Sequence, residues 1–181
     1  MMNFLSQTKN FFEHLNRNVF FLSLAQIFSM TSMNINIITT GLAGFIIAPY
    51  GWLSTFPLSL QFIITMLFTF PCSILMSKYG RKIVFVGGVL SVSTGGLIMT
   101  IALFQKNFYL FCFGSVLLGL GHATNLFYRY AATETVPKNV KPKAMSLVLS
   151  AGLIAALLGP RIYQISADAM LPNLYAGSYL M

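Results

Sequence analysis

The sequence predicts an all-α fold: a polytopic membrane helix bundle with five transmembrane helices and the start of a sixth. Of its 181 residues, 56% are hydrophobic and only 8% are charged, whereas soluble domains carry about 25% charged residues. The 60 residues from 18 to 77 contain no Lys, Arg, Asp, Glu or His. Because a helix needs about 20 apolar residues to cross ~30 Å of hydrocarbon, this run alone predicts two crossings.

The N-terminal segment, residues 1–17, is expected to precede a single transmembrane domain over residues 18–181. It mixes Phe11 and Phe12 with the charged residues Lys9 and Glu13, a pattern that suits a short helix lying on the cytoplasmic interface. An irregular cytoplasmic tail is the alternative that this pattern leaves open.

The first two spans are expected at about 18–48 and 52–77, joined by a turn at residues 49–51. The first span is longer than one perpendicular crossing needs. We therefore expect it to tilt, or to break near Gly41 and Gly44.

The second span contains two prolines and a polar stripe. Pro57 and Pro71 predict kinks, which membrane helices tolerate when neighbours satisfy the freed backbone groups. The polar side chains recur at steps of four, four and three, so they share one helix face. We interpret this face as a packing surface, with the lining of a polar path as the alternative. The stripe comprises Gln61, Thr65, Thr69 and Cys72.

The third and fourth spans are expected at about 82–105 and 107–130. In the third, Ser91 and Gly95 form a small-xxx-small pair that predicts close approach of another helix. In the fourth, polar residues fall within roughly 80° of arc at 100° per residue, so this face is expected to look inward. These residues are Ser115, His122, Asn125 and Arg129.

Within these spans His122 is the titratable residue expected deepest in the membrane. An ionisable residue inside the membrane is by default hypothesised to have a functional role. A neutral His that hydrogen-bonds a neighbouring helix is the structural alternative, and we prefer it at this stage.

The fifth span is expected at about 142–166 and contains Gly152, Gly159 and Pro160. Pro160 cannot donate to a carbonyl one turn earlier, so the helix should bend or stop there, while the glycines allow a neighbour to approach. From about residue 175 the sequence resembles the opening of a sixth span.

The net charge of +8 is explained by membrane orientation, so no nucleic-acid partner is implied. With the N-terminus in the cytoplasm, nine basic residues lie inside and two outside, which predicts this orientation. The expected location is the inner (plasma) membrane, as a multi-pass protein. The inner residues are Lys9, Arg17, Lys78, Arg81, Lys82, Arg129, Lys138, Lys141 and Lys143, and the outer ones are Lys106 and Arg161.

Catalytic chemistry is not indicated. The sequence has three carboxylates, Glu13, Glu134 and Asp168, all near predicted interfaces, and two histidines far apart. A metal site or an acid–base pair needs more convergent groups. We therefore expect no enzyme, no metal and no cofactor, and the two cysteines inside spans imply no disulfide.

The segment from Ser73 to Lys82 resembles the signature loop of the major facilitator superfamily, usually written G-x-L-A-D-R-x-G-R-K. Gly80, Arg81 and Lys82 match this motif. Ser73, Ser77 and Lys78 stand where the family has Gly, Asp and Arg. The resemblance implies that Ser77 to Lys82 form a loop that takes part in the conformational change.

Other segments resemble the same family in the expected order. Residues 119–121 resemble its fourth-helix motif, and residues 130–147 its fourth-to-fifth loop. Gly152, Gly159 and Pro160 resemble the fifth-helix motif of proton-linked exporters. The family fold implies two six-helix halves with the substrate near the midplane between them.

The resemblance implies secondary transport of a small solute or drug through the lipid bilayer. Gln61, Thr65, His122, Asn125 and Arg129 are the candidates for lining such a path. Arg129 and Glu134 are expected to form an inner charge cluster close to the Lys78–Lys82 turn.

Because five spans match only an amino-terminal half, the first expectation is a truncated transporter whose activity as a single chain stays open. A half-transporter that works as a dimer or with a missing second half is the alternative. An integral membrane scaffold that binds partners without transport is a third.

Overall fold

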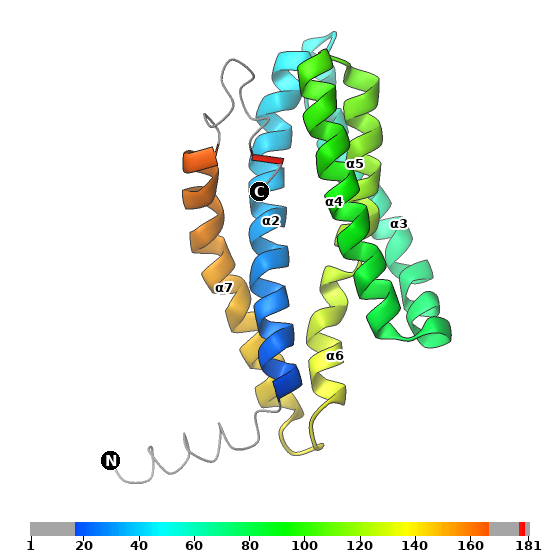
Figure 1. Cartoon of the computed structure of the whole chain (residues 1–181), viewed down its shortest axis with the longest axis vertical. Helices are drawn as coiled ribbons and strands as arrows, with labels where there is room; N and C mark the ends of the chain where they lie inside the picture. Colours follow the sequence, from blue (N-terminus) through cyan, green and yellow to red (C-terminus); the bar gives the residue numbers. More distant parts are fainter. Residues whose placement is uncertain (1–16, 167–177, 180–181) are drawn as a thin grey trace.

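The computed structural model describes residues 17–166 and 178–179, and these ranges consist of helices and short connections (Figure 1). The expected all-α class is confirmed for this part of the chain. The N-terminal segment and the start of a sixth span fall almost wholly outside the described residues. From those two segments the structure describes Arg17, Ser178 and Tyr179, each in a helical conformation.

Six α-helices and two short 3₁₀ helices follow one another along the described chain (Figure 1). Together they give five stretches long and apolar enough to cross a membrane, which confirms the predicted five spans. The elements are α2 Arg17–Ile47, η1 Gly51–Leu53, α3 Phe56–Tyr79, α4 Arg81–Gln105, α5 Phe108–His122, η2 Asn125–Phe127, α6 Tyr128–Glu134 and α7 Lys141–Ser166.

The first span is one uninterrupted helix, α2, so the break considered near Gly41 and Gly44 is absent. Gly44 instead permits a close approach. A Cβ atom placed there would lie 2.1 Å from the carbonyl oxygen of Ser54, in the turn that leads to α3. The small residue therefore lets this turn fold back onto the end of α2.

The two prolines of α3 have different positions. Pro57 lies in the first turn, where a backbone N–H has no intrahelical partner, so it costs no hydrogen bond. The kink expected at Pro57 is therefore not required. Pro71 lies inside the helix, which continues past it to Tyr79.

The fourth span is not one helix, contrary to the sequence-based expectation. Helix α5 ends at His122, η2 follows, and α6 completes the crossing. The hydroxyl of Thr124 donates to the carbonyl of Gly121 at 2.8 Å, and backbone bonds of the i to i−3 type form at Thr124 and Phe127. Because a 3₁₀ turn holds fewer residues than an α-helical turn, residues after the break leave the face predicted for them.

Helix α7 runs through Pro160 to Ser166, so Pro160 does not end it. The side-chain amide of Asn34 on α2 donates to the carbonyl of Ala155 at 3.3 Å, close to the proline. A Cβ atom at Gly159 would lie 2.8 Å from Cβ of Asn34, so this glycine allows the expected close approach. No described atom lies within 4 Å of the equivalent position at Gly152.

The helices pack in two groups that meet along the middle of the bundle. Helix α7 lies along α2, and α4 and α3 both pack on α5 (Figure 1). The α4–α5 contact uses small residues, as predicted: Ser91 donates to the carbonyl of Leu117 at 2.7 Å, and Gly95 lies against Gly114. Close approach of these two helices follows.

Large apolar side chains cover the outside of the bundle, as expected of a surface that faces lipid. Among them are Phe45, Trp52, Met66, Phe70, Leu153 and Leu157, each at least 70% exposed.

Basic residues gather at the end of the bundle where α2 begins. This end also holds the α3–α4 turn and the α6–α7 connection (Figure 1). In the described part of the chain it contains Arg17, Lys78, Arg81, Lys82, Lys138, Lys141 and Lys143, and the opposite end contains Lys106 and Arg161.

Candidate functional site

A chain of hydrogen bonds crosses the interior of the bundle. Helix α2 contributes Asn36 and Thr40, α3 contributes Gln61, and α5 contributes His122. All four side chains are buried, at 4% exposure or less. Polar groups at this depth need partners within the protein, because lipid offers none.

The direction of each bond follows from the orientation of the Asn36 and Gln61 amides. The Thr40 hydroxyl donates to Oδ1 of Asn36 at 2.8 Å, so it accepts from the Tyr179 hydroxyl at 2.9 Å. Nδ2 of Asn36 donates to Oε1 of Gln61 at 2.7 Å, which leaves Nε2 of Gln61 to donate to Nδ1 of His122 at 3.0 Å. Bonds aligned in one sense strengthen one another.

With the amides in this orientation, Nδ1 of His122 accepts a hydrogen bond, so the proton of the neutral ring is on Nε2. Nε2 is buried and has no partner among the described residues. Asn125 is in the same situation: its Oδ1 accepts from the Ser29 hydroxyl, while its buried Nδ2 has no described partner. The site therefore presents two buried donors, one from each residue.

Both residues line a cavity of about 510 Å³ between α2, α4 and the junction of α5 and α6. Apolar and aromatic side chains form most of its wall, and no Lys, Arg, Asp or Glu lines it among the described residues. The wall includes Phe28, Ser29, Val92, Leu97, Tyr128 and Tyr179.

The structure brings together three of the five residues predicted to line a path. Gln61 and His122 share a hydrogen bond, and Asn125 lines the cavity beside His122. Thr65 does not line it. Its hydroxyl donates to the carbonyl of Gly119 on α5 at 3.0 Å, which is a helix-packing contact.

Arg129 also lies outside the cavity. Its guanidinium carbon lies 5.0 Å from the centre of the Tyr130 ring, a cation–π contact. The 3₁₀ turn that precedes it separates Arg129 from the face of His122.

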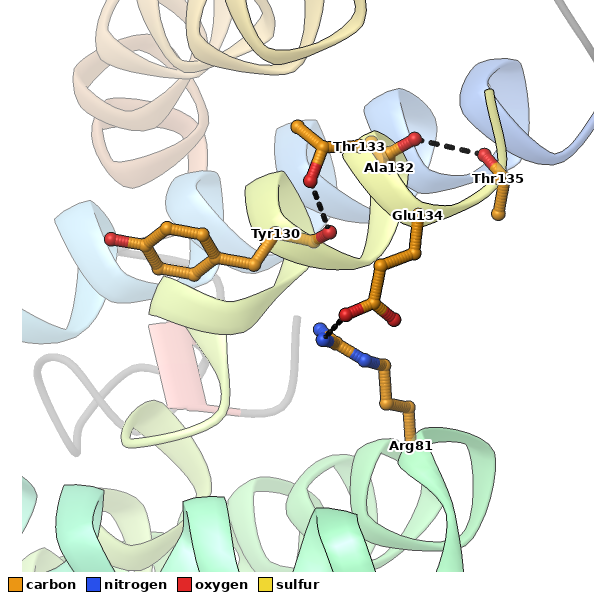
Figure 2. A network of polar contacts seen from close by, with 6 residues as sticks. All are labelled: Arg81, Tyr130, Ala132, Thr133, Glu134 and Thr135. Carbon is orange, nitrogen blue, oxygen red and sulfur yellow. Dashed lines mark hydrogen bonds and ion pairs between the residues drawn. The ribbon is translucent and has the colours of Figure 1, made fainter. Parts of the chain in front are cut away.

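The predicted inner charge cluster has a different composition. Figure 2 shows Arg81, at the start of α4, reaching Glu134 at the end of α6, where the two side chains form an ion pair. It is the one ion pair among residues 17–166 and 178–179, and Arg129 does not join it. The expected proximity of the basic turn to Glu134 therefore involves Arg81.

One residue of the signature-loop motif, Gly80, is required by the backbone conformation of the α3–α4 turn. Gly80 has φ +84°, a conformation that favours glycine, and it both ends α3 and begins α4. Ser77, in the family's acidic position, donates to the carbonyl of Ile74 at 2.8 Å. Lys78 and Lys82 are exposed.

Sequence reasoning missed the contribution of α2. Ser29, Ser32, Asn36 and Thr40 recur at steps of three, four and four, so they fall within roughly 80° of arc on one helix face. The same spacing test that identified the stripe in α3 would have found them. In the described residues no group of three His, Cys, Asp or Glu side chains could hold a metal ion.

Comparison with known proteins identifies the family of this chain. The family model of the Major Facilitator Superfamily matches residues 10–169. The chain is 32% identical to the riboflavin transporter RfnT of Brucella anthropi over 164 residues, which are 91% of this chain and 41% of the transporter. It is 30% identical to the uncharacterized MFS-type transporter YddS of Bacillus subtilis over 108 residues, 58% of this chain and 24% of that one. No solved structure matches the chain.

Proposed function

Because this chain belongs to the major facilitator superfamily, we propose that it forms one half of a secondary transporter for a small solute. It is a multi-pass membrane protein with five helical stretches able to span the bilayer. Members of this family are generally not enzymes. The chain spans less than half the length of both transporters that it resembles.

The observation that supports this proposal is the buried hydrogen-bond chain that ends at the cavity. Polar side chains inside a membrane are costly, and they mark solute pathways when they face a cavity. Here the hydrogen bonds from Tyr179 to Gln61 hold the ring of His122 in the wall of the cavity, and the N–H of this ring has no described partner. A purely structural network would pair both of its ends.

Riboflavin is the first solute to test, because 91% of this chain aligns with the riboflavin transporter RfnT, over 41% of that transporter. Transport in this family rocks one half against another around a central site. We propose that a second copy of this chain supplies the other half, and that a separate polypeptide is the alternative.

The charge distribution supports an orientation with the N-terminus in the cytoplasm. The basic end of the bundle, which contains Arg17 and the α3–α4 turn, would lie on the cytoplasmic side of the inner membrane. There the pair of Arg81 and Glu134 links α4 to α6 and would hold that side of the half together.

Riboflavin counterflow tests the proposal in proteoliposomes that contain the full chain. We expect tritiated riboflavin to accumulate above protein-free vesicles, and His122→Phe to lower the initial rate about tenfold if one hydrogen bond to solute is lost. The matched control is Ser91→Ala, which removes a hydrogen bond between α4 and α5 outside the cavity. Flux equal to that of protein-free vesicles, with helical protein present, would contradict riboflavin transport by copies of this chain.

A further inference from the structure

Two residues in the wall of the cavity between α2, α4 and the α5–α6 junction carry hydrogen-bond donors that no described group pairs. Nε2 of His122 and Nδ2 of Asn125 are both buried, on side chains 2% and 4% exposed, and neither has a described partner. Both residues line the cavity. A buried donor without a partner costs free energy, which a ligand that accepts its hydrogen bond recovers.

In the hydrogen-bond network of the structure both groups are donors. A proton on Nδ1 of His122 would require the amides of Gln61 and Asn36 to reverse together, because the oxygen of Gln61 accepts from Asn36. The oxygen of Asn125 accepts from the Ser29 hydroxyl, which leaves the amide nitrogen as the donor. In this arrangement the ligand supplies acceptor atoms at both points.

The wall of the cavity argues against a charged ligand. Among the described residues it contains no side chain with a full charge. An ion there would be removed from water without a partner of opposite sign, which is strongly unfavourable. An uncharged ligand avoids this cost.

The size and remaining lining of the cavity favour a compact apolar body. Its volume of about 510 Å³ is within the range of pockets that bind small molecules. Phe28, Tyr128 and Tyr179 present rings to it, and Val92 and Leu97 present aliphatic groups. Aromatic and apolar walls of this kind suit a flat ring system.

We propose that this cavity binds an uncharged ring compound whose carbonyl oxygens or ring nitrogens accept hydrogen bonds from His122 and Asn125. The inference rests on the proposed transport function and names the chemical class of its solute. Binding and transport are nevertheless separate measurements.

Equilibrium dialysis of the full chain in lipid nanodiscs tests the inference with two matched probes. Caffeine is uncharged, flat and rich in acceptors, and it has no hydrogen-bond donor. Theophylline-7-acetate has the same ring system and an added carboxylate. We expect saturable binding of tritiated caffeine and at least about tenfold weaker binding of the acetate, since an unpaired charge must be desolvated.

Two variants test the donors. His122→Phe and Asn125→Leu each remove one donor and keep a similar volume, and each should weaken caffeine binding about tenfold. Ser91→Ala should leave it unchanged, because Ser91 is not part of the cavity wall. Circular dichroism and size-exclusion chromatography of all variants verify that they fold.

The inference is overturned if caffeine shows no saturable binding, if the acetate binds equally well, or if both folded donor variants keep wild-type affinity. Riboflavin flux without this binding pattern would leave the transport proposal standing and remove the cavity assignment. The binding pattern without flux would leave the cavity assignment standing and remove the transport proposal.

Discussion

Gln61 lies in the middle of the buried chain of hydrogen bonds, and its contacts explain why one amide contributes to the stability of this membrane bundle. It is fully buried, accepts from Asn36 on α2 and donates to His122 on α5. Its side chain thus joins three helices through two hydrogen bonds. Both partners are buried, so loss of this amide leaves their polar groups without a partner.

Replacing Gln61 by Leu should therefore destabilise the fold. The change keeps a similar volume and leaves Nδ2 of Asn36 and Nδ1 of His122 unpaired, at about 1–3 kcal/mol for each buried group. Thermal unfolding followed by circular dichroism measures the loss. Thr94→Val is the control, since exposed Thr94 bonds only to carbonyls of its own helix. Equal melting temperatures for both variants would show that the hydrogen bonds of Gln61 contribute no stability.

At the scale of the elements, the junction between α5 and α6 shapes the site. Gly121 lies against α4 so closely that a Cβ atom there would be 2.5 Å from the carbonyl oxygen of Gly88. The 3₁₀ turn that follows directs Asn125 into the cavity. Close packing and the turn together position both donors.

Adding a methyl group at Gly121 should separate α4 from α5. Backbone atoms cannot yield as a flexible side chain can, so we expect Gly121→Ala to cost about 1–3 kcal/mol. Gly41→Ala is the matched control, because no described atom lies within 4 Å of its Cβ position. That variant should be neutral or more stable by about 0.5–1 kcal/mol, as alanine favours helix. Denaturation in SDS compares the stability of the two variants. A Gly121→Ala variant more stable than the Gly41→Ala variant would contradict the close packing of α5 on α4.

For the whole molecule, the five spans could be predicted from the sequence because uncharged runs of sufficient length have few alternatives. The family could be predicted because the segment from Ser73 to Lys82 resembles its signature loop. The break after His122 could not, since it depends on Thr124 bonding back to Gly121 and on contact with α4. The pairing of Glu134 with Arg81, in place of Arg129, likewise depends on how separate helices pack. Spacing along one helix does not contain that information.

The orientation of the whole bundle leads to a labelling prediction. In a background with Cys72→Ala and Cys112→Ala, a membrane-impermeant thiol reagent added to intact cells should label Lys106→Cys. It should not label Ser77→Cys, in the exposed α3–α4 turn, until the cells are opened. This result follows if the basic end faces the cytoplasm. The opposite labelling pattern would reverse the proposed orientation.

The tautomer of His122 tests the central claim most directly, because the proposed solute site depends on a donor at Nε2. Nitrogen NMR of ¹⁵N-histidine protein in nanodiscs, with His14→Gln to leave a single histidine, reports the protonation of each ring nitrogen. We predict an unprotonated Nδ1 and a protonated Nε2, with the Nε2 signal shifting when caffeine is added. A proton on Nδ1, or an Nε2 signal that caffeine does not change, would contradict the account.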